Sequence, residues 1–161
     1  MTMTLLAWAV AGLGATVVLT VLLVAGQGLG VTRMSLPFLL GAMFTPDRDR
    51  AKLVGTLLHL ANGWLFSILY FATFALAGRG SIQLGAVIGL VHGVFVAAVG
   101  LPLLPAFHPR VARPHAGPTA ERRLEPPGFL ARNYGWSTGA VIVFSHVVFG
   151  AVLGLGASLV R

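Results

Sequence analysis

The sequence predicts an all-α polytopic membrane protein, a bundle of four transmembrane helices forming one domain over residues 1–161. Two observations predict it. Only 9% of the residues are charged and 57% are hydrophobic, whereas a soluble domain carries about 25% charged residues. Charge-free stretches, each longer than the roughly 20 residues that cross a bilayer, occur four times: Met1–Thr32, Leu53–Gly78, Gly80–Pro109 and Asn133–Val160. This composition excludes a soluble enzyme, a disordered chain and a disulfide-stapled secreted domain.

The four helices are expected approximately over residues 5–26, 51–76, 82–104 and 136–160. They are helices because lipid offers the backbone no hydrogen-bond partner, and the alternating segments of about ten residues that form a β-barrel do not occur. The first helix is expected to be retained, since Met1–Val10 has no basic residue and the apolar run is too long for a signal peptide. For the second helix we expect Thr45 as the N-cap and Pro46 at the first helical position.

The basic residues are distributed unequally between the two sides of the predicted bundle. Nine lie in or beside the loops 27–50 and 105–135: Arg33, Arg48, Arg50, Lys52, Arg110, Arg113, Arg122, Arg123 and Arg132. Only Arg79 and Arg161 lie on the other side. The positive-inside rule therefore places both loops in the cytoplasm and both termini outside, in the inner membrane of a bacterium.

The loop 105–135 is the one long connection, and its six prolines predict little regular helix. Four of its arginines are expected to bind anionic lipid headgroups: Arg110, Arg113, Arg122 and Arg123. A docking surface for a protein partner is the alternative. Nucleic acid is not expected as a partner, because the positive charge lies where topology requires it. The loop histidines His108 and His115 are expected to be solvated.

The first loop contains a mostly apolar stretch, Met34–Phe44, which is expected to lie in the membrane interface. Part of it resembles a stretch that precedes the fourth helix: Leu36-Pro37-Phe38-Leu39 and Pro127-Gly128-Phe129-Leu130. Each stretch is followed by a helix with a histidine and, four residues on, a glycine. The chain would then consist of two repeated αα hairpins related by a two-fold axis along the membrane normal. Chance similarity between glycine- and leucine-rich helices is the alternative.

Small residues recur every fourth position on the third and fourth helices: Gly85, Gly89 and Gly93, and then Gly150 and Gly154. Residues four apart share a helix face, and close backbone packing through small residues drives helix association in lipid. We expect these glycines to pack helices within the chain. Homodimerisation or docking onto another membrane subunit is the alternative.

Three histidines lie well inside the predicted helices: His59, His92 and His146. At 1.5 Å per residue, all three approach one layer near the midplane or the cytoplasmic half. Asn62 follows His59 by three residues and is expected to share its face. An ionisable group inside a membrane is a functional-site hypothesis, so these four residues form the candidate ligand site.

Several chemistries suit this set. Neutral imidazoles ligate transition metals, two on facing helices could hold a haem iron, and histidine with asparagine could bind a quinone or pass protons. The simpler interpretation is an interhelical hydrogen bond for each histidine, worth about 0.6–2 kcal/mol. No carboxylate is available to support a metal there, because the acids all lie in the loops: Asp47, Asp49, Glu121 and Glu125.

Two helical segments carry a family resemblance: Leu60-Ala61-Asn62-Gly63-Trp64 and the run from Phe144 to Gly154. They resemble the helices of small uncharacterised bacterial four-span integral membrane proteins. The resemblance covers most of the chain, implies four membrane helices and assigns no activity to any residue.

We therefore expect a non-enzymatic membrane protein that acts by helix packing, as a homo-oligomer or as an accessory subunit of a membrane complex. The alternative is an intramembrane ligand-binding or transport module built on the three histidines and Asn62. A third hypothesis is an enzyme that acts on lipid through Glu121, Glu125 and the loop histidines.

Overall fold

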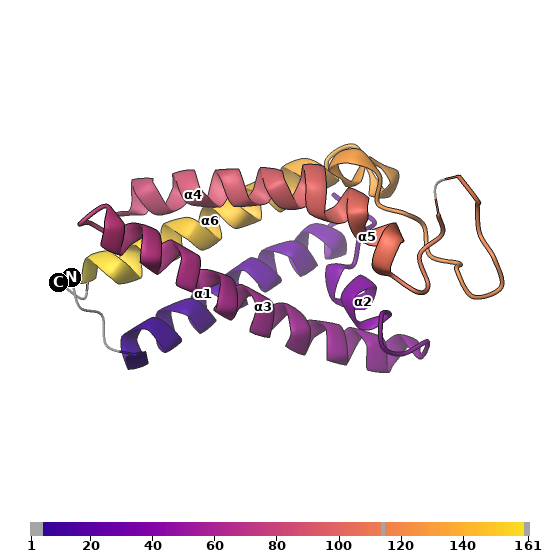
Figure 1. The fold of residues 1–161 in the computed structure, drawn as a ribbon, viewed down its shortest axis with the longest axis horizontal. Helices are drawn as coiled ribbons and strands as arrows, with labels where there is room; N and C mark the ends of the chain where they lie inside the picture. Colours follow the sequence, from indigo (N-terminus) through magenta and orange to yellow (C-terminus); the bar gives the residue numbers. More distant parts are fainter. Residues whose placement is uncertain (1–4, 114, 160–161) are drawn as a thin grey trace.

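The computed structural model describes residues 5–113 and 115–159 (Figure 1). Four helical segments are long and apolar enough to cross a membrane, which indicates a multi-pass membrane protein. They are α1 (Leu5–Gly28), α3 (Arg48–Leu76), α6 (Thr138–Leu159) and a continuous run formed by α4 (Ile82–Phe95), the π-helical turn η1 (Val96–Gly100) and α5 (Leu101–Phe107). Two short pieces complete the fold: α2 (Leu36–Gly41) and the 3-10 helix η2 (Phe129–Tyr134). The described residues form no strand, so the all-helical prediction is confirmed.

The predicted helix ends agree with the structure to within three residues where the structure describes them. Residue 160 and Arg161 lie outside the described residues. The predicted N-cap of α3 is wrong: Asp47, not Thr45, caps the helix, and its carboxylate accepts a hydrogen bond from the Arg50 backbone N–H at 2.8 Å. A carboxylate at this position also faces the positive end of the helix dipole, and Pro46 stays outside the helix.

The long helices neighbour one another in the order α3, α1, α6, α4 (Figure 1). α3 and α4 follow each other through a short turn, yet they contact each other little. The connections that contain α2 and η2 lie at the end of the bundle opposite that turn, which we call the loop end (Figure 1). The interior between the long helices and the loop end are therefore two separate places where a site can be built.

α1 and α3 cross through small and hydroxylated residues. A Cβ atom built on Gly63 would lie 2.3 Å from the methyl carbon of Thr16. The two helices are therefore too close at this point for any residue larger than glycine. Toward the α3–α4 turn, the Trp8 indole N–H donates to the Ser67 hydroxyl at 2.9 Å. Trp8 also stacks on Trp64 with 4.7 Å between the ring centroids. Close packing and this polar contact therefore help to fix the crossing.

α4 and α6 approach each other even more closely, through the predicted glycines. A Cβ atom on Gly85 would lie 2.0 Å from the Gly150 carbonyl oxygen, and one on Gly89 would lie 2.1 Å from that of His146. Gly93 and Gly154 face the α6 backbone at Val143 and the Ser81 carbonyl oxygen, respectively. These glycines pack two helices of the same chain, which leaves them no outward surface.

α2 lies against the first turns of α3. Cβ atoms on Gly41 and Gly55 would lie 1.7 and 1.6 Å from the carbonyl oxygens of Ala51 and Pro37, respectively. Much of the stretch Met34–Phe44 is therefore covered by protein, although Phe44 itself is exposed. The two stretches that would correspond in a hairpin repeat differ in conformation: α2 is α-helical, whereas η2 is a 3-10 helix interrupted by two left-handed residues. The hairpin repeat therefore stays a prediction.

The π-helical turn η1 has a local cause. Pro102 has no backbone N–H and its ring would clash with the carbonyl of Ala98 four residues earlier, so the ordinary helical bond cannot form there. The chain instead inserts a wider turn, in which the Leu101 N–H reaches back to the Val96 carbonyl. This turn sets the direction in which α5 enters the loop end.

Candidate functional site

Two of the predicted histidines meet inside the bundle. The rings of His92 on α4 and His146 on α6 lie edge to face, with 4.8 Å between their centroids. They meet because Gly89 and Gly93 let α4 approach the backbone of α6 at this level. Tyr70 on α3 joins them, since its hydroxyl lies 3.0 Å from the His92 Nδ1 atom. Three helices thus contribute one ring each to this layer.

Hydrogen bonds orient both imidazoles. The Nδ1 atom of His146 donates to the Ile142 carbonyl at 2.8 Å, which leaves Nε2 as the lone-pair nitrogen of the neutral ring. The His92 ring stacks on Phe66 at 4.9 Å. Among the residues that the structure describes, neither Nε2 atom has a hydrogen-bond partner. The pair therefore presents unused nitrogen atoms beside aromatic walls.

His59 and Asn62 lie elsewhere. The Nδ1 atom of His59 lies 2.9 Å from the Thr20 hydroxyl, so this buried histidine serves the α1–α3 crossing. Asn62 is exposed on the outward side of α3 and is not turned into the bundle with His59. Of the four predicted ligand residues, the contacts bring together only His92 and His146.

The arrangement suits an organic ligand better than a metal. Within 5–113 and 115–159, no group of three histidine, cysteine or acidic residues could hold a metal ion. Two imidazoles in edge-to-face contact at 4.8 Å also leave no room for a porphyrin between them. When the Tyr70 hydroxyl donates to His92 Nδ1, the His92 Nε2 N–H can donate to a lipid-soluble carbonyl, whereas the lone pair of His146 Nε2 accepts from a hydroxyl.

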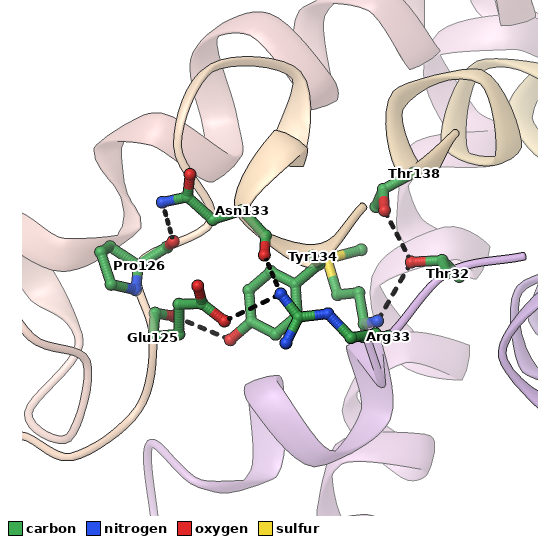
Figure 2. Close-up of polar contacts among 8 residues, drawn as sticks. Thr32, Arg33, Glu125, Pro126, Asn133, Tyr134 and Thr138 are labelled. Atoms are coloured by element: carbon green, nitrogen blue, oxygen red, sulfur yellow. Dashed lines mark hydrogen bonds and ion pairs between the residues drawn. The ribbon is translucent and has the colours of Figure 1, made fainter. Parts of the chain in front are cut away.

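A second polar cluster lies at the loop end, where the segment after α1 meets the segment before α6 (Figure 2). The Arg33 guanidinium donates to the Asn133 carbonyl and lies 3.5 Å from the Glu125 carboxylate. The Tyr134 hydroxyl donates to the Glu125 carbonyl at 2.7 Å, and Thr32 and Thr138 share a hydroxyl bond of 2.7 Å. Burial, reinforced by Glu125, raises the pKa of Tyr134 to about 12, so its hydroxyl stays a donor at neutral pH.

His108 corrects one sequence prediction. It is fully buried rather than solvated, because the loop folds back onto α2. Its Nε2 atom donates to the Leu39 carbonyl at 2.9 Å, and its Nδ1 atom accepts from the backbone N–H groups of Arg110 and Val111. Burial lowers the pKa of His108, so the ring is neutral in the folded protein. His115 is exposed, as predicted.

The four loop arginines have different surroundings. One Nη atom of Arg122 donates to three backbone carbonyls: Pro105, His108 and Val111. Arg110 donates to the Ala42 carbonyl, and Arg123 uses Nε for the Ala120 carbonyl at 2.7 Å. Arg113 is exposed. Arg110 and Arg122 thus hold the loop on the bundle, while Arg123 keeps guanidinium N–H groups available.

Two cavities flank Arg123 at the loop end. The larger, of about 590 Å³, is bounded by the end of α1, α2, the start of α3 and the segment 123–134. Its lining includes four basic residues: Arg33, Arg48, Lys52 and Arg123. The other, of about 560 Å³, shares Phe38, Arg123 and Leu124 with it. The sequence did not predict this cavity, because topology alone accounts for basic residues in the first loop.

No protein-family model matches this sequence, and neither a curated protein nor a solved structure is significantly similar to it. The resemblance to small bacterial four-span proteins therefore stays a prediction.

Proposed function

We propose that the protein is a non-enzymatic inner-membrane protein of a bacterium that acts through helix packing as a homodimer. Its loops 27–50 and 105–135 lie in the cytoplasm and both termini lie outside, by the distribution of the basic residues. The observation that supports dimerisation is an amide on the lipid-facing side of α3. Asn62 is exposed and is the central residue of this 29-residue helix, which places it near the middle of the bilayer.

An amide at this depth requires a partner. Without a hydrogen bond, transfer of an amide from water to hydrocarbon costs roughly 4–8 kcal/mol. A second copy supplies the missing groups, because an asparagine side chain carries both donors and an acceptor. Two copies inserted in the same orientation hold Asn62 at the same depth, so the two amides meet across a two-fold axis.

The neighbours of Asn62 form a seam of the kind that joins two parallel helices. Asn62, Leu65, Leu69, Ala72 and Leu76 alternate three and four residues apart, which is the a/d pattern of a coiled coil. All five are exposed, Leu65 by 53%, Leu69 by 59% and Leu76 by 91%. Asn62 occupies an a position, where a single asparagine fixes the register of a parallel dimer.

The glycine stripes do not compete for this role. Gly85, Gly89, Gly150 and Gly154 already face backbone of their own chain. We therefore propose the α3 seam as the interface. Its occupant is a second copy of the chain rather than a different subunit of a membrane complex.

Single-cysteine cross-linking tests the dimer directly, because the chain has no cysteine. We expect Leu69→Cys to form a disulfide-linked dimer in oxidised membranes, whereas Leu57→Cys forms no disulfide cross-link. Leu57 is the matched control, since it lies on the same helix, is also 59% exposed and is off the seam. Equal cross-linking at both positions, or none at Leu69, contradicts the dimer.

The contribution of the amide is tested by Asn62→Leu, with Leu57→Ala as the control for a change on the same helix. A lost interhelical hydrogen bond of about 0.6–2 kcal/mol corresponds to a dimer weakened by roughly 3- to 30-fold. Native mass spectrometry from mild detergent measures the dimer fraction. A stoichiometric complex with a different subunit, unaffected by Asn62→Leu, supports the accessory role instead.

A second candidate function is the binding of a lipid-soluble ligand between α3, α4 and α6. The contact between His92 and His146, with Tyr70 at 3.0 Å from His92, favours it. The same mass spectra detect such a ligand as added mass. Loss of the adduct in a His92→Phe variant, with retention in a His59→Phe variant, supports this site, and the absence of any adduct in wild-type protein excludes it.

A further inference from the structure

The cavity of about 590 Å³ collects positive charge from three segments that are distant in the sequence. Arg33 comes from the connection between α1 and α2, Arg48 and Lys52 from the first turns of α3, and Arg123 from the long loop. Glu125 is the acid among the residues that line it. The fold therefore concentrates three net positive charges around one hollow.

These charges are poorly neutralised by the protein. The Arg33–Glu125 and Lys52–Asp49 pairs are both 3.5 Å long and exposed, and exposed pairs of this kind contribute little. Arg48 forms no ion pair with any residue that the structure describes. Arg123 donates through Nε, which leaves its remaining N–H groups for another acceptor. The hollow therefore offers charged donors to an anion.

The lining of the cavity also contains apolar side chains. It includes Val24, Phe38 and Leu39, and Val24 belongs to the membrane-crossing part of α1, where it is 48% exposed. Because Val24 lies on α1, the lining joins the basic loops to a helix that is long and apolar enough to cross a membrane. A ligand that contacts both kinds of side chain has an anionic head and an apolar chain.

We infer that this cavity binds the phosphate group of an anionic lipid, with the guanidinium groups of Arg48 and Arg123 and the ammonium group of Lys52 as its donors. Guanidinium groups bind phosphate through paired, charge-assisted hydrogen bonds, and lysine adds a point charge. The acyl chains would lie along the Val24 side, in the bilayer. This site goes beyond the proposed dimer and does not depend on it, because none of its residues belongs to the α3 seam.

The test compares two double variants of equal charge. Arg48→Gln/Lys52→Gln removes two cavity donors, while Arg50→Gln/Arg113→Gln removes two bases that do not line the cavity. Binding of phosphatidylglycerol is measured by native mass spectrometry of the full chain in mild detergent. We expect one bound lipid per chain, about tenfold weaker binding in the first variant, and less than about twofold change in the second.

Two further probes identify what is recognised. Phosphatidylethanolamine with the same acyl chains should bind more weakly than phosphatidylglycerol, because its ammonium group is repelled by the cavity bases. If the bound phosphate group belongs to a lipid, excess glycerol 3-phosphate should not displace phosphatidylglycerol. Displacement would instead assign the phosphate site to a soluble phosphate ester. Equal loss in both double variants, or equal binding of both lipids, overturns the inference.

A third variant keeps the test independent of the start of α3. Arg123 lies in the long loop, and Arg123→Gln should also weaken phosphatidylglycerol binding. Its thermal unfolding midpoint should equal that of the Arg113→Gln single variant. Unchanged lipid binding in Arg123→Gln and in the first double variant rejects the site.

Discussion

Gly85 and Gly150 face each other backbone to backbone, because a Cβ atom built on either residue would lie 2.0 Å from the carbonyl oxygen of the other. The contact is symmetric and involves no side chain that could move aside. At such a distance the Cα–H groups approach carbonyl oxygens, a weak contact that recurs where helices cross closely. The α4–α6 crossing therefore excludes even one methyl group on either helix.

Gly85→Ala and Gly150→Ala should each destabilise the protein by about 1–3 kcal/mol, as overpacking does in a filled core. Thermal unfolding in detergent measures the effect. Gly14→Ala is the control, since nothing lies within 4 Å of its added Cβ atom. Alanine favours a helix interior over glycine by roughly 0.5–1 kcal/mol, so Gly14→Ala should be neutral or stabilising. Equal losses at positions 14 and 85 would contradict the crossing.

Ser145 should tolerate the loss of its hydroxyl. Its Oγ atom is the one fully buried side-chain nitrogen or oxygen atom without a hydrogen-bond partner in the described part of the chain. Removing an unsatisfied polar group relieves a desolvation cost of about 1–3 kcal/mol. We therefore expect Ser145→Ala to unfold at the wild-type temperature or above it. A clear decrease would reveal a partner for this hydroxyl that the contacts do not show.

Arg122 should matter for the structure of the loop end. Its substitution by glutamine leaves the carbonyls of Pro105, His108 and Val111 without their shared donor. We expect limited proteolysis to cleave the segment 108–128 several times faster, while the helices remain protected. Arg113→Gln removes the same charge from an exposed position and should digest like wild type. Identical digestion of both variants would show that the three bonds do not hold the loop.

The loop end should weaken in acid through His108. Burial holds the pKa of this histidine below its ordinary value of 6.5, and the unfolded chain therefore binds the proton more readily. The contribution of the neutral ring is fully present above pH 6.5 and decreases as the pH falls below it. Protonation would also turn the Nδ1 acceptor into a donor facing two backbone N–H groups.

Hydrogen exchange of the Arg110 and Val111 amides, measured from about pH 8 to pH 5, checks this dependence after correction for intrinsic exchange. His108→Asn provides the comparison, because an amide oxygen accepts a hydrogen bond but does not titrate. The wild-type protection should decrease in acid and the His108→Asn protection should not. Parallel curves would assign any pH effect to another group.

The helices could be predicted because the reason for them is local. Every backbone group in lipid must bond within its own segment, so length and apolarity suffice to locate a spanning helix. The partners of these helices depend on contacts between distant residues. His108 bonds to Leu39 from 69 residues further along the chain, and no pattern around either residue contains that information.

The placement of Asn62 shows how a face can be misjudged. The buried stripe of α3 runs through Gly55, His59, Gly63 and Ser67, and it is narrow. A residue three positions after His59 is rotated by about 60° from it, which is enough to leave such a stripe. The expectation that Asn62 shares the face of His59 is therefore wrong, because the structure turns His59 inward and Asn62 outward.

The π-helical turn η1 has a consequence for comparisons between related sequences. A wider turn is equivalent to one extra residue in a regular helix, so α5 is rotated by about 100° relative to an uninterrupted continuation of α4. Deleting one residue between 96 and 100 would remove this extra residue and turn His108 away from the Leu39 carbonyl on α2. A one-residue gap at this point of an alignment therefore marks a homologue with a rebuilt loop end, although its four spans would look unchanged.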